Sequence, residues 1–398
     1  MKRILTLIIA VVMALTILLM PSSTCFAKLL SDEEVAVKIK KLQKGIDART
    51  EADRAKDGDV RERYKDAIVI DMLIPGTPEG YVGGTVADYE NMVEVSRSTG
   101  FTYVSYTAAI DDTFEPLQII HWIAKAHIHW GNNPQKYLVV ETVDDIYKAK
   151  KDGKFAVGLN FQGSNALGGN LDMVEIYYKL GVRQMNFAYN VRNFMSDGGG
   201  AAPDRDGGLS KAGIRLVKEM NRVGMIVDCT HSSNRTCLDA AKASTKPIVL
   251  SHSNAYGSYA LPRNAPDEVI KAVARTGGVI GTNTLGGFHN KEGNASPEDM
   301  AKNVNYIKAL VGAEFTAWGS DYVHPQVYLE ALKFVLRDPE SYPPALGYGS
   351  QTQLALPGDI WGVVNVLEEK YKWTEAEIRG FLGKNALRVY KANWKLKI

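Results

Sequence analysis

Cysteine is scarce in this sequence, which has three cysteines in 398 residues. Cys25 lies near the N-terminus, which leaves Cys229 and Cys237 for the rest of the chain. Two cysteines do not make a disulfide framework, and whether they are bridged or free stays open at this stage. An excess of one charge is lacking too, because 47 Lys and Arg residues stand against 45 Asp and Glu. The net charge of +2 therefore gives no indication of nucleic-acid binding.

The first 27 residues have the pattern of a secretory signal. The basic start MKR is followed by an apolar run over residues 4–20 and then by the small or neutral residues PSSTCFA. This pattern predicts cleavage after Ala27. An uncleaved anchor is the alternative, since the apolar run is at the short edge of the length that spans a bilayer. We expect an exported protein that is periplasmic, extracellular or tethered by an uncleaved signal.

Residues 28–66 are rich in charge and are predicted to form a helical extension. Ser31 followed by Glu34 is a capping-box pattern, which marks the start of a helix. From residue 67 onward, short β-rich apolar runs alternate with segments of helical period, and further helices are expected after residue 358. The expected strands are 67–72, 102–109, 155–162, 183–190, 225–231, 247–253, 277–284 and 315–322, and the expected helices between them include 171–181, 209–224, 234–245 and 267–277.

The alternation of strand and helix is typical of parallel strand pairing. The strands are continuously apolar, which indicates burial on both faces. Eight such strands with outer helices predict a single α/β domain over residues 67–398, a (β/α)8 TIM-type barrel with extra N- and C-terminal helices. An open doubly wound sheet is the alternative, but no G-x-G-x-x-G follows the first strand, so its dinucleotide-binding form is not supported.

The carboxyl ends of barrel strands carry the active site in this architecture. His231 and His252 end two neighbouring strands, and imidazole is a common zinc ligand, so they are candidate metal ligands. A hydrogen-bonded polar pair is the alternative. Asp321, at the end of the last strand, is a candidate ligand or the group that takes a proton from bound water. Arg263 is a candidate to hold a substrate carboxylate, or a surface salt bridge.

Other polar residues have weaker support. Gln162 and Tyr189 also end predicted strands, and His324 follows Asp321 closely enough to reach the mouth of the barrel. The HIH motif at 127–129 lies in a helical stretch, where positions i and i+2 do not share a face. We therefore do not expect a metal there.

Several of these segments resemble the renal (membrane) dipeptidase family of zinc peptidases. GMIVDCTHSSNRT and PIVLSHSNA resemble the two metal-histidine segments, LPRNAPDEVIKAV the loop of the carboxylate-binding arginine, and WGSDY the segment of the catalytic aspartate. LGGNLDMVEIYYKLGVRQMNFAYN and FLGKNALRVY match as well, so the similarity runs from about residue 65 to 395. The resemblance implies a (β/α)8 barrel with a two-zinc site, a small peptide-like substrate and a homodimer.

The sequence departs from this family at the metal ligands. The family's first strand ends in Asp-x-His-x-Asp, whereas residues 71–75 are Asp-Met-Leu-Ile-Pro, so Leu73 and Pro75 take the positions of two ligands. Gln162 stands in place of the glutamate that bridges both zincs, and Tyr189 in place of a histidine that contacts substrate. We therefore expect at most one zinc, unless the loop 76–88 supplies replacement ligands.

Three interpretations of function stay open. In the first, His231, His252 and Asp321 hold one zinc with an open position for water, which is the usual catalytic arrangement. Arg263 would then anchor a dipeptide or related small amide, Tyr189 would stabilise the developing oxyanion, and Gln162 or His324 would assist. In the second, an inactive relative binds a small carboxylate ligand or partner without turnover. In the third, the protein matures an exported peptide natural product.

Overall fold

The computed structural model describes residues 30–43, 57–78, 85–111 and 115–395. The predicted signal at 1–27 lies outside these ranges. Two helices precede the barrel, α2 (Asp32–Gln43) and α4 (Gly58–Arg63). The predicted capping box at the start of α2 is present, with Glu34 N donating to Ser31 Oγ at 3.2 Å and Ser31 N to Glu34 Oε2 at 2.7 Å. Within the described ranges, no helix has the length and apolar character needed to cross a membrane.

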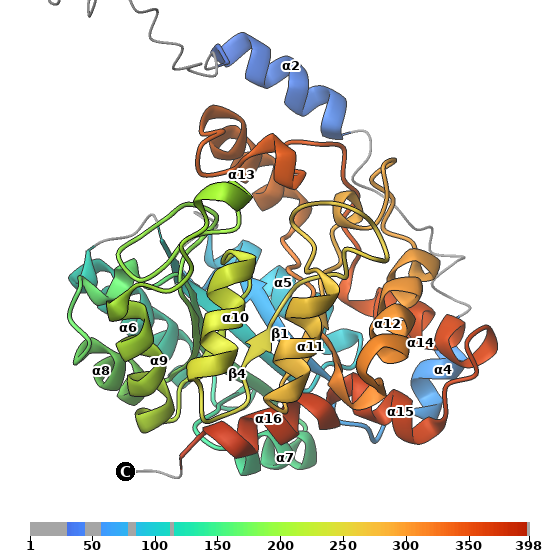
Figure 1. The fold of residues 1–398 in the computed structure, drawn as a ribbon. Coiled ribbons are helices and arrows are strands. Elements are labelled where there is room, and N and C mark those ends of the chain that lie inside the picture. Colours follow the sequence, from blue (N-terminus) through green and yellow to red (C-terminus); the bar gives the residue numbers. More distant parts are fainter. Residues whose placement is uncertain (1–29, 44–56, 79–84, 112–114, 396–398) are drawn as a thin grey trace, which may run out of the picture.

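The strands form one parallel sheet that curves into a near-closed barrel, as predicted (Figure 1). Their order is β1-β2-β4-β5-β6-β7-β8-β9, and a short additional strand, β3, pairs with β4 outside this path. The strands are β1 (Ile70–Pro75), β2 (Tyr103–Ile110), β3 (Tyr137–Val139), β4 (Phe155–Gln162), β5 (Val182–Asn186), β6 (Ile226–Asp228), β7 (Val249–Leu250), β8 (Val279–Thr282) and β9 (Thr316–Trp318).

The two ends of the sheet meet just beyond β9. Asp321 N donates to Leu73 O at 3.0 Å, and Ser320 N donates to Asp71 Oδ1 at 2.9 Å. These bonds bring the segment after β9 alongside β1, so that Asp321 lies next to the end of the first strand. Closure therefore places the first and last predicted site segments side by side, although they are far apart in the sequence.

Helices surround the barrel, and α8 to α11 match the four helices named from the sequence. In α9, Ser210 Oγ accepts from Gly213 N, apolar side chains including Leu216 and Met220 are buried, and Gly224 ends the helix at φ 100. The helices are α5 (Val86–Ser98), α6 (Pro116–Gly131), α7 (Val143–Asp152), α8 (Met173–Lys179), α9 (Lys211–Val223), α10 (Asn234–Ala243), α11 (Asp267–Arg275), α12 (Pro297–Val311), α13 (Pro325–Arg337), α14 (Ile360–Glu369), α15 (Glu375–Arg379) and α16 (Asn385–Asn393).

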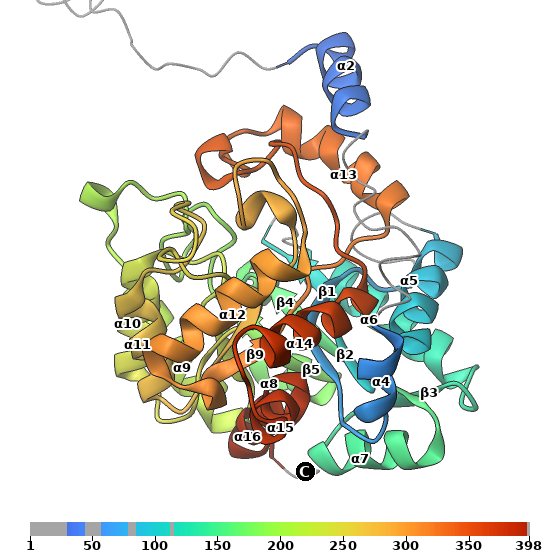
Figure 2. The ribbon, with the colours of Figure 1, turned by 90° about the vertical axis from the view of Figure 1, so that its right-hand side faces the viewer.

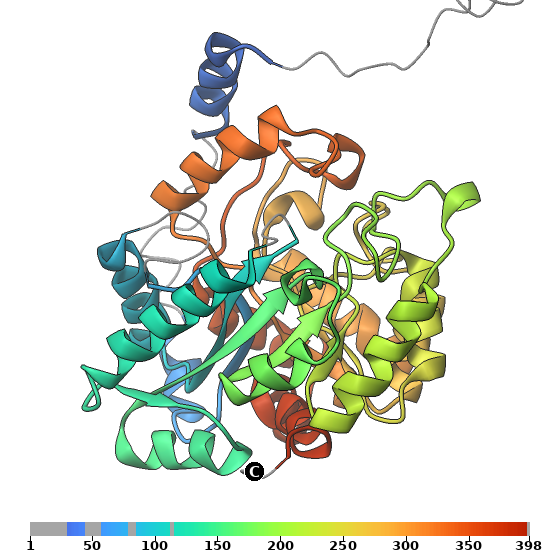
Figure 3. The ribbon, with the colours of Figure 1, turned by 90° about the vertical axis from the view of Figure 1, so that its left-hand side faces the viewer.

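Helix α13 lies at one end of the barrel, while α7 and α16 lie at the opposite end (Figures 2 and 3). Helix α2 lies on the far side of α13 from the barrel and is joined to it by an ion pair between Asp32 and Arg337. Because α13 directly follows the segment after β9, it lies over the carboxyl ends of the strands. The predicted site is therefore covered by α13 and the segment that follows it.

The two described cysteines are both free and buried. Cys229 follows β6, and Cys237 lies in α10 with its thiol donating to Cys229 O at 3.2 Å. Both side chains belong to the hydrophobic core. This settles the question left open by their spacing in favour of two thiols that contribute to packing.

Candidate active site

The loops that carry the predicted site residues adopt an unusual backbone conformation. Asn190, His231 and Asp321 have φ values of 59, 66 and 56, in the left-handed region. Among the described residues, Lys372 is the one other non-glycine residue with a positive φ. Such conformations cost roughly 1–3 kcal/mol each and cluster at functional sites. Here they follow β5, β6 and β9, where the chain turns sharply to direct these side chains toward the barrel mouth.

His231 and His252 are brought together as the sequence predicted. Their Nε2 atoms lie 2.8 Å apart, so one of them must carry the hydrogen of a shared hydrogen bond. His231 Nδ1 lies 3.0 Å from Asn190 Oδ1, and His252 Nδ1 lies 2.7 Å from Ser251 Oγ. We assign hydrogens to His231 Nδ1, which donates to the amide oxygen, and to His252 Nε2, which donates to His231 Nε2. The Ser251 hydroxyl then donates to His252 Nδ1.

Few metal-binding side chains lie beside this pair among the described residues, and residues 79–84 of the loop 76–88, considered as a source of replacement ligands, lie outside them. Within the described ranges, no group of three or more His, Cys, Asp or Glu side chains converges in a way that could hold a metal ion. Leu73 is fully buried at the end of β1, and Pro75 lines a cavity there. Gln162 Nε2 donates to Thr107 Oγ1 at 3.0 Å, and the buried Oε1 is a neutral oxygen that brings no charge. The two histidines alone fall short of the three protein ligands that zinc needs.

Burial disfavours the charged form of both imidazoles. It lowers the pKa of His231 and of His252 well below the ordinary value, and the nearby Arg263 guanidinium lowers both further. Arg263 is only 8% exposed; its Nη2 lies 3.4 Å from His231 Nε2 and donates to His252 O at 3.3 Å. Its Nε is buried without a hydrogen-bond partner in the described part of the chain. No described carboxylate lies within ion-pair distance of it, although its charge acts on the Asp321 carboxylate across a longer distance.

Asp321 is the carboxylate that best matches the role of a catalytic base. Its Oδ2 accepts a hydrogen bond from Asn283 Nδ2 at 3.0 Å. Surrounding protein atoms desolvate the carboxylate and raise its pKa to about 6, against the lowering effects of the Arg263 charge and of the Asn283 hydrogen bond. The side chain nevertheless keeps part of its surface exposed to a cavity. A carboxylate in this state can accept a proton near neutral pH.

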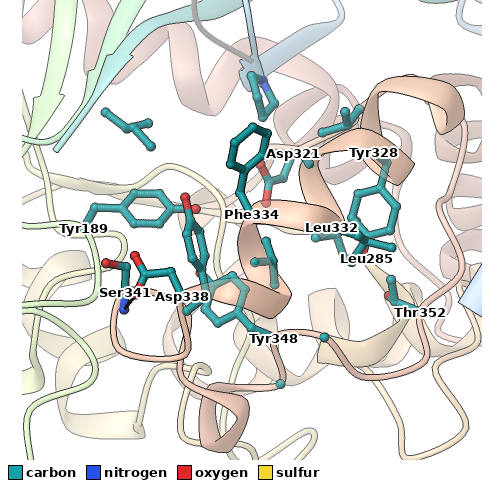
Figure 4. A pocket seen from close by; sticks show the side chains of 18 of the residues that line it. Tyr189, Leu285, Asp321, Tyr328, Leu332, Phe334, Asp338, Ser341, Tyr348 and Thr352 are labelled. Carbon is teal, nitrogen blue, oxygen red and sulfur yellow. Dashed lines mark hydrogen bonds between the residues drawn. The ribbon is translucent and has the colours of Figure 1, made fainter. Parts of the chain in front are cut away.

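Two cavities divide the predicted site residues between them. Asp321 and Tyr189 line a cavity of about 710 Å3 beneath α13, and both side chains point into it (Figure 4). His231 and Arg263 line a smaller one of about 340 Å3. The Tyr189 ring stacks on the His231 ring, and Arg263 lies over the Phe288 ring, 5.4 Å from its centroid. Since Phe288 lines the larger cavity, these two contacts form part of the wall between the cavities.

Other residues considered from the sequence lie elsewhere. His252, Gln162 and His324 line neither of these cavities; His324 is half-buried at the start of α13. The HIH motif lies in α6 as expected, with His127 Nε2 near Leu180 O at 2.8 Å and His129 Nε2 near Glu90 Oε1 at 2.5 Å. These two histidines therefore have structural partners.

Asp111 is a site residue that the sequence analysis missed. It accepts hydrogen bonds from Asn165 N at 2.9 Å, Tyr189 N at 3.1 Å and Asn193 Nδ2 at 2.7 Å, so one carboxylate joins the loops after β2, β4 and β5. It lines the larger cavity, and burial raises its pKa to about 6. The signal was present, since an acidic residue follows Ile110 at the end of the second strand, but the predicted strand stopped at residue 109.

The fold and the polar residues at its carboxyl end place the protein in the class of amidohydrolase-like (β/α)8 barrels. A crystal structure of an amidohydrolase from Pseudomonas aeruginosa superposes with a TM-score of 0.73 and 27% sequence identity, covering 84% of this chain and 99% of that one. Within this class, the chain belongs to the membrane dipeptidase family (peptidase family M19), whose family model matches residues 83–340. The predicted family is thereby confirmed.

Two further relatives illustrate the similarity. An uncharacterized dipeptidase of Schizosaccharomyces pombe is 30% identical over 292 residues, which is 72% of this chain and 63% of the relative. The chain thus spans less than two thirds of that relative's length. A metallopeptidase from Rhodobacter sphaeroides, crystallised with a phosphinate mimic of the dipeptide L-Ala-D-Ala, has a TM-score of 0.64 at 17% identity. It covers 82% of this chain and 100% of that one, and this match supports the fold alone.

Proposed function

We propose that this protein hydrolyses dipeptides or related small amides that have a free carboxylate. The observation that carries the proposal is Arg263, a buried guanidinium whose described hydrogen-bond partners, Ser253, His231 and His252, include no carboxylate. An unpaired buried charge is costly, and a bound carboxylate would offset that cost. Family membership supports the choice of substrate, and the Rhodobacter sphaeroides relative was crystallised with a dipeptide mimic.

The residues of this chain have separate roles in the proposal. Arg263 binds the substrate carboxylate. Asp321 takes a proton from the attacking water at the edge of the larger cavity and gives it to the amine that leaves when the amide C–N bond breaks. Tyr189 extends into the same cavity, where its hydroxyl donates a hydrogen bond to the developing oxyanion (Figure 4). The substrate would occupy both cavities, because Asp321 lines the larger one and Arg263 the smaller one. It would therefore cross the wall between them at Tyr189.

The proposal includes at most one zinc, and no step depends on it. His231 and His252 would be its ligands, but their Nε2 atoms share a hydrogen bond at 2.8 Å. With bonds of about 2.1 Å, two nitrogens of a tetrahedral zinc lie farther apart than this, and both must present lone pairs. Metal binding therefore requires the two rings to separate and His252 to move its hydrogen to Nδ1.

Binding without hydrolysis is the second candidate. It is favoured by the same hydrogen-bonded pair, together with the apolar Leu73 and Pro75 at the end of β1. In this case the carboxylate site at Arg263 is kept while the means of activating water is lost.

The deciding experiment combines calorimetry, turnover and metal content on one purified protein. We expect dipeptides to bind, to be hydrolysed slowly, and to lose affinity at least tenfold in Arg263→Met, because one charged partner is removed. Arg388→Met is the matched control, since Arg388 is an arginine far from the site that donates to Gly277 O. Binding without turnover, with or without added zinc, would favour the second candidate. No binding would contradict both.

We further propose that the protein is exported by its first 27 residues, on the sequence pattern alone. Cell fractionation with N-terminal sequencing tests this. A mature chain that begins at Lys28 supports cleavage, whereas a membrane-bound chain that begins at Met1 supports the anchor. A soluble cytosolic chain with an intact N-terminus would contradict export.

A further inference from the structure

The larger cavity is more apolar than a site for two small residues requires. Its walls come from the end of β1, the loops after β2, β4, β5, β8 and β9, helix α13 and the segment 338–352. Apolar side chains from all sides line it, among them Pro75, Ile110, Leu285, Val323 and Leu332. Its volume of about 710 Å3 lies in the upper part of the range for pockets that hold drug-sized ligands. A dipeptide of small residues would leave much of this space filled with water.

Aromatic rings form a continuous part of the wall. Tyr342 lies edge-on to Tyr189 at 5.9 Å and to Tyr348 at 5.4 Å, and Tyr348 lies edge-on to Phe288 at 6.2 Å between ring centroids. Phe334 also lines the cavity while 69% of its surface is exposed. Rings in this arrangement offer edges and faces to a further ring, and such contacts add to the gain from burying apolar surface.

Charged groups in the lining belong mainly to two places. Arg192, Arg337 and Asp338 come from surface segments, whereas Asp321 and Asp111 lie at the strand ends. Pro75 adds apolar surface where the family pattern puts an acidic ligand, so the part of the cavity next to Asp321 is less polar than that pattern implies. A ligand that matches this distribution is polar near Asp321 and bulky and apolar beneath α13.

We infer that the substrates are peptide-like carboxylates with a bulky aromatic group, which occupies the space beneath α13. The inference rests on the proposed function for the position of the amide at Asp321 and the carboxylate at Arg263. The aromatic group supplies most of the selectivity, because burying one such side chain is worth about 10- to 100-fold in affinity. Small dipeptides such as Gly-Gly are correspondingly poor ligands.

The test compares Gly-Gly with Phe-Trp, the latter in its L,L and L,D forms, for binding by calorimetry and for turnover. We expect at least one form of Phe-Trp to bind 10- to 100-fold more tightly than Gly-Gly. In Ala331→Trp, a new indole fills part of the cavity, and this advantage should fall at least fivefold while Gly-Gly binding stays unchanged. Glu330→Trp is the matched control, because Glu330 is the preceding residue of the same helix and is exposed.

The outcomes separate this inference from the proposed function. If Gly-Gly is bound as tightly and hydrolysed as fast as Phe-Trp, the inference is wrong but the proposed hydrolytic function still stands. If Phe-Trp binds tightly but is not cleaved, hydrolysis is wrong and the aromatic site remains. An apolar fluorescent probe, anilinonaphthalene sulfonate, checks the cavity without any peptide. Its binding to the folded protein should weaken in Ala331→Trp, and equal binding in both would overturn the inference.

Discussion

The ring of Tyr189 stacks on the ring of His231, with centroids 3.9 Å apart and an angle of 19° between planes. This contact covers one face of an imidazole whose two nitrogens are already engaged, Nδ1 with Asn190 and Nε2 with His252. Tyr189 therefore both closes the wall between the two cavities and holds His231 in its hydrogen-bonded position. The aromatic residue at the family's histidine position has a structural consequence as well as a chemical one.

Substitutions at Tyr189 should separate these two roles. Tyr189→Phe keeps the stack and loses the hydroxyl, so we expect stability within about 0.5 kcal/mol of wild type and a fall in kcat of roughly 100-fold with little change in KM. Tyr189→Ala also loses the stack and should cost about 1–3 kcal/mol of stability. Denaturant unfolding and steady-state kinetics measure both. An unchanged kcat in Tyr189→Phe would remove the hydroxyl from the proposed mechanism.

The metal content should rise when the family's ligands are restored. We expect wild type to contain less than one zinc per chain, and the triple variant Leu73→His, Pro75→Asp and Gln162→Glu to bind more. The three changes supply lone pairs and two negative charges next to a preformed histidine pair. Elemental analysis by mass spectrometry gives the stoichiometry, with circular dichroism as the check on folding. Full zinc occupancy in wild type would show that the chain has metal ligands other than His231, His252 and Asp321.

Asp111 should act as a positioning residue for Tyr189. Asp111→Asn loses the charge and keeps an oxygen for only one of the two backbone amides, since Asn165 N donates to Oδ1 and Tyr189 N to Oδ2, whereas Asp111→Ala removes both contacts. We expect kcat to fall about tenfold or less in the first and more in the second, with KM for a small dipeptide nearly unchanged. In the background of Tyr189→Phe, the effect of Asp111→Ala on kcat should largely disappear. Full additivity of the two changes would show that Asp111 acts on something other than Tyr189.

The barrel could be predicted because its strands are short, β-rich apolar runs that alternate with amphipathic helices. The strand bounds were less accurate where polar residues begin. The fifth predicted strand was extended to 231, but β6 ends at Asp228. Beyond that point the backbone bonds to loops, with Asn190 N and Gly199 N both donating to His231 O. Strand β3 was missed, since its three residues are too short to form a recognisable apolar run.

The site was predictable only in part. The position of His231 and His252 at the ends of neighbouring strands was enough to predict that they lie together. It was not enough to show that Tyr189 covers His231, because ring stacking depends on side-chain packing that no local pattern encodes. Much of the wall of the larger cavity comes from the segment 338–352 and α13, whose sequence has no motif for a site. Asp111 was missed for a related reason, since its partners belong to two other loops.

The buried carboxylate of Asp71 predicts a pH dependence of stability. Burial raises its pKa to about 7, against hydrogen bonds from Ser320 and Leu73 that lower it. The unfolded chain has the ordinary aspartate pKa near 4, so the folded state keeps a proton that the unfolded state releases as the pH rises from about 4 to 7. Asp71 therefore favours the folded state most at acidic pH and progressively less toward neutrality.

Asp71→Asn isolates this contribution, because the amide has a similar shape and does not titrate. We expect the free energy of unfolding of wild type, relative to the variant, to fall by about 3–4 kcal/mol between pH 4 and pH 7. Other buried groups also contribute to the pH dependence of stability: Asp111 and Asp321 through raised pKa values, and the buried histidines, in the opposite direction, through lowered ones. The comparison with the variant cancels these contributions because both proteins contain the same groups. Urea unfolding at half-unit pH intervals measures the difference. A constant difference across this range would mean that Asp71 is ionised in the folded protein and that a cation or water compensates its burial.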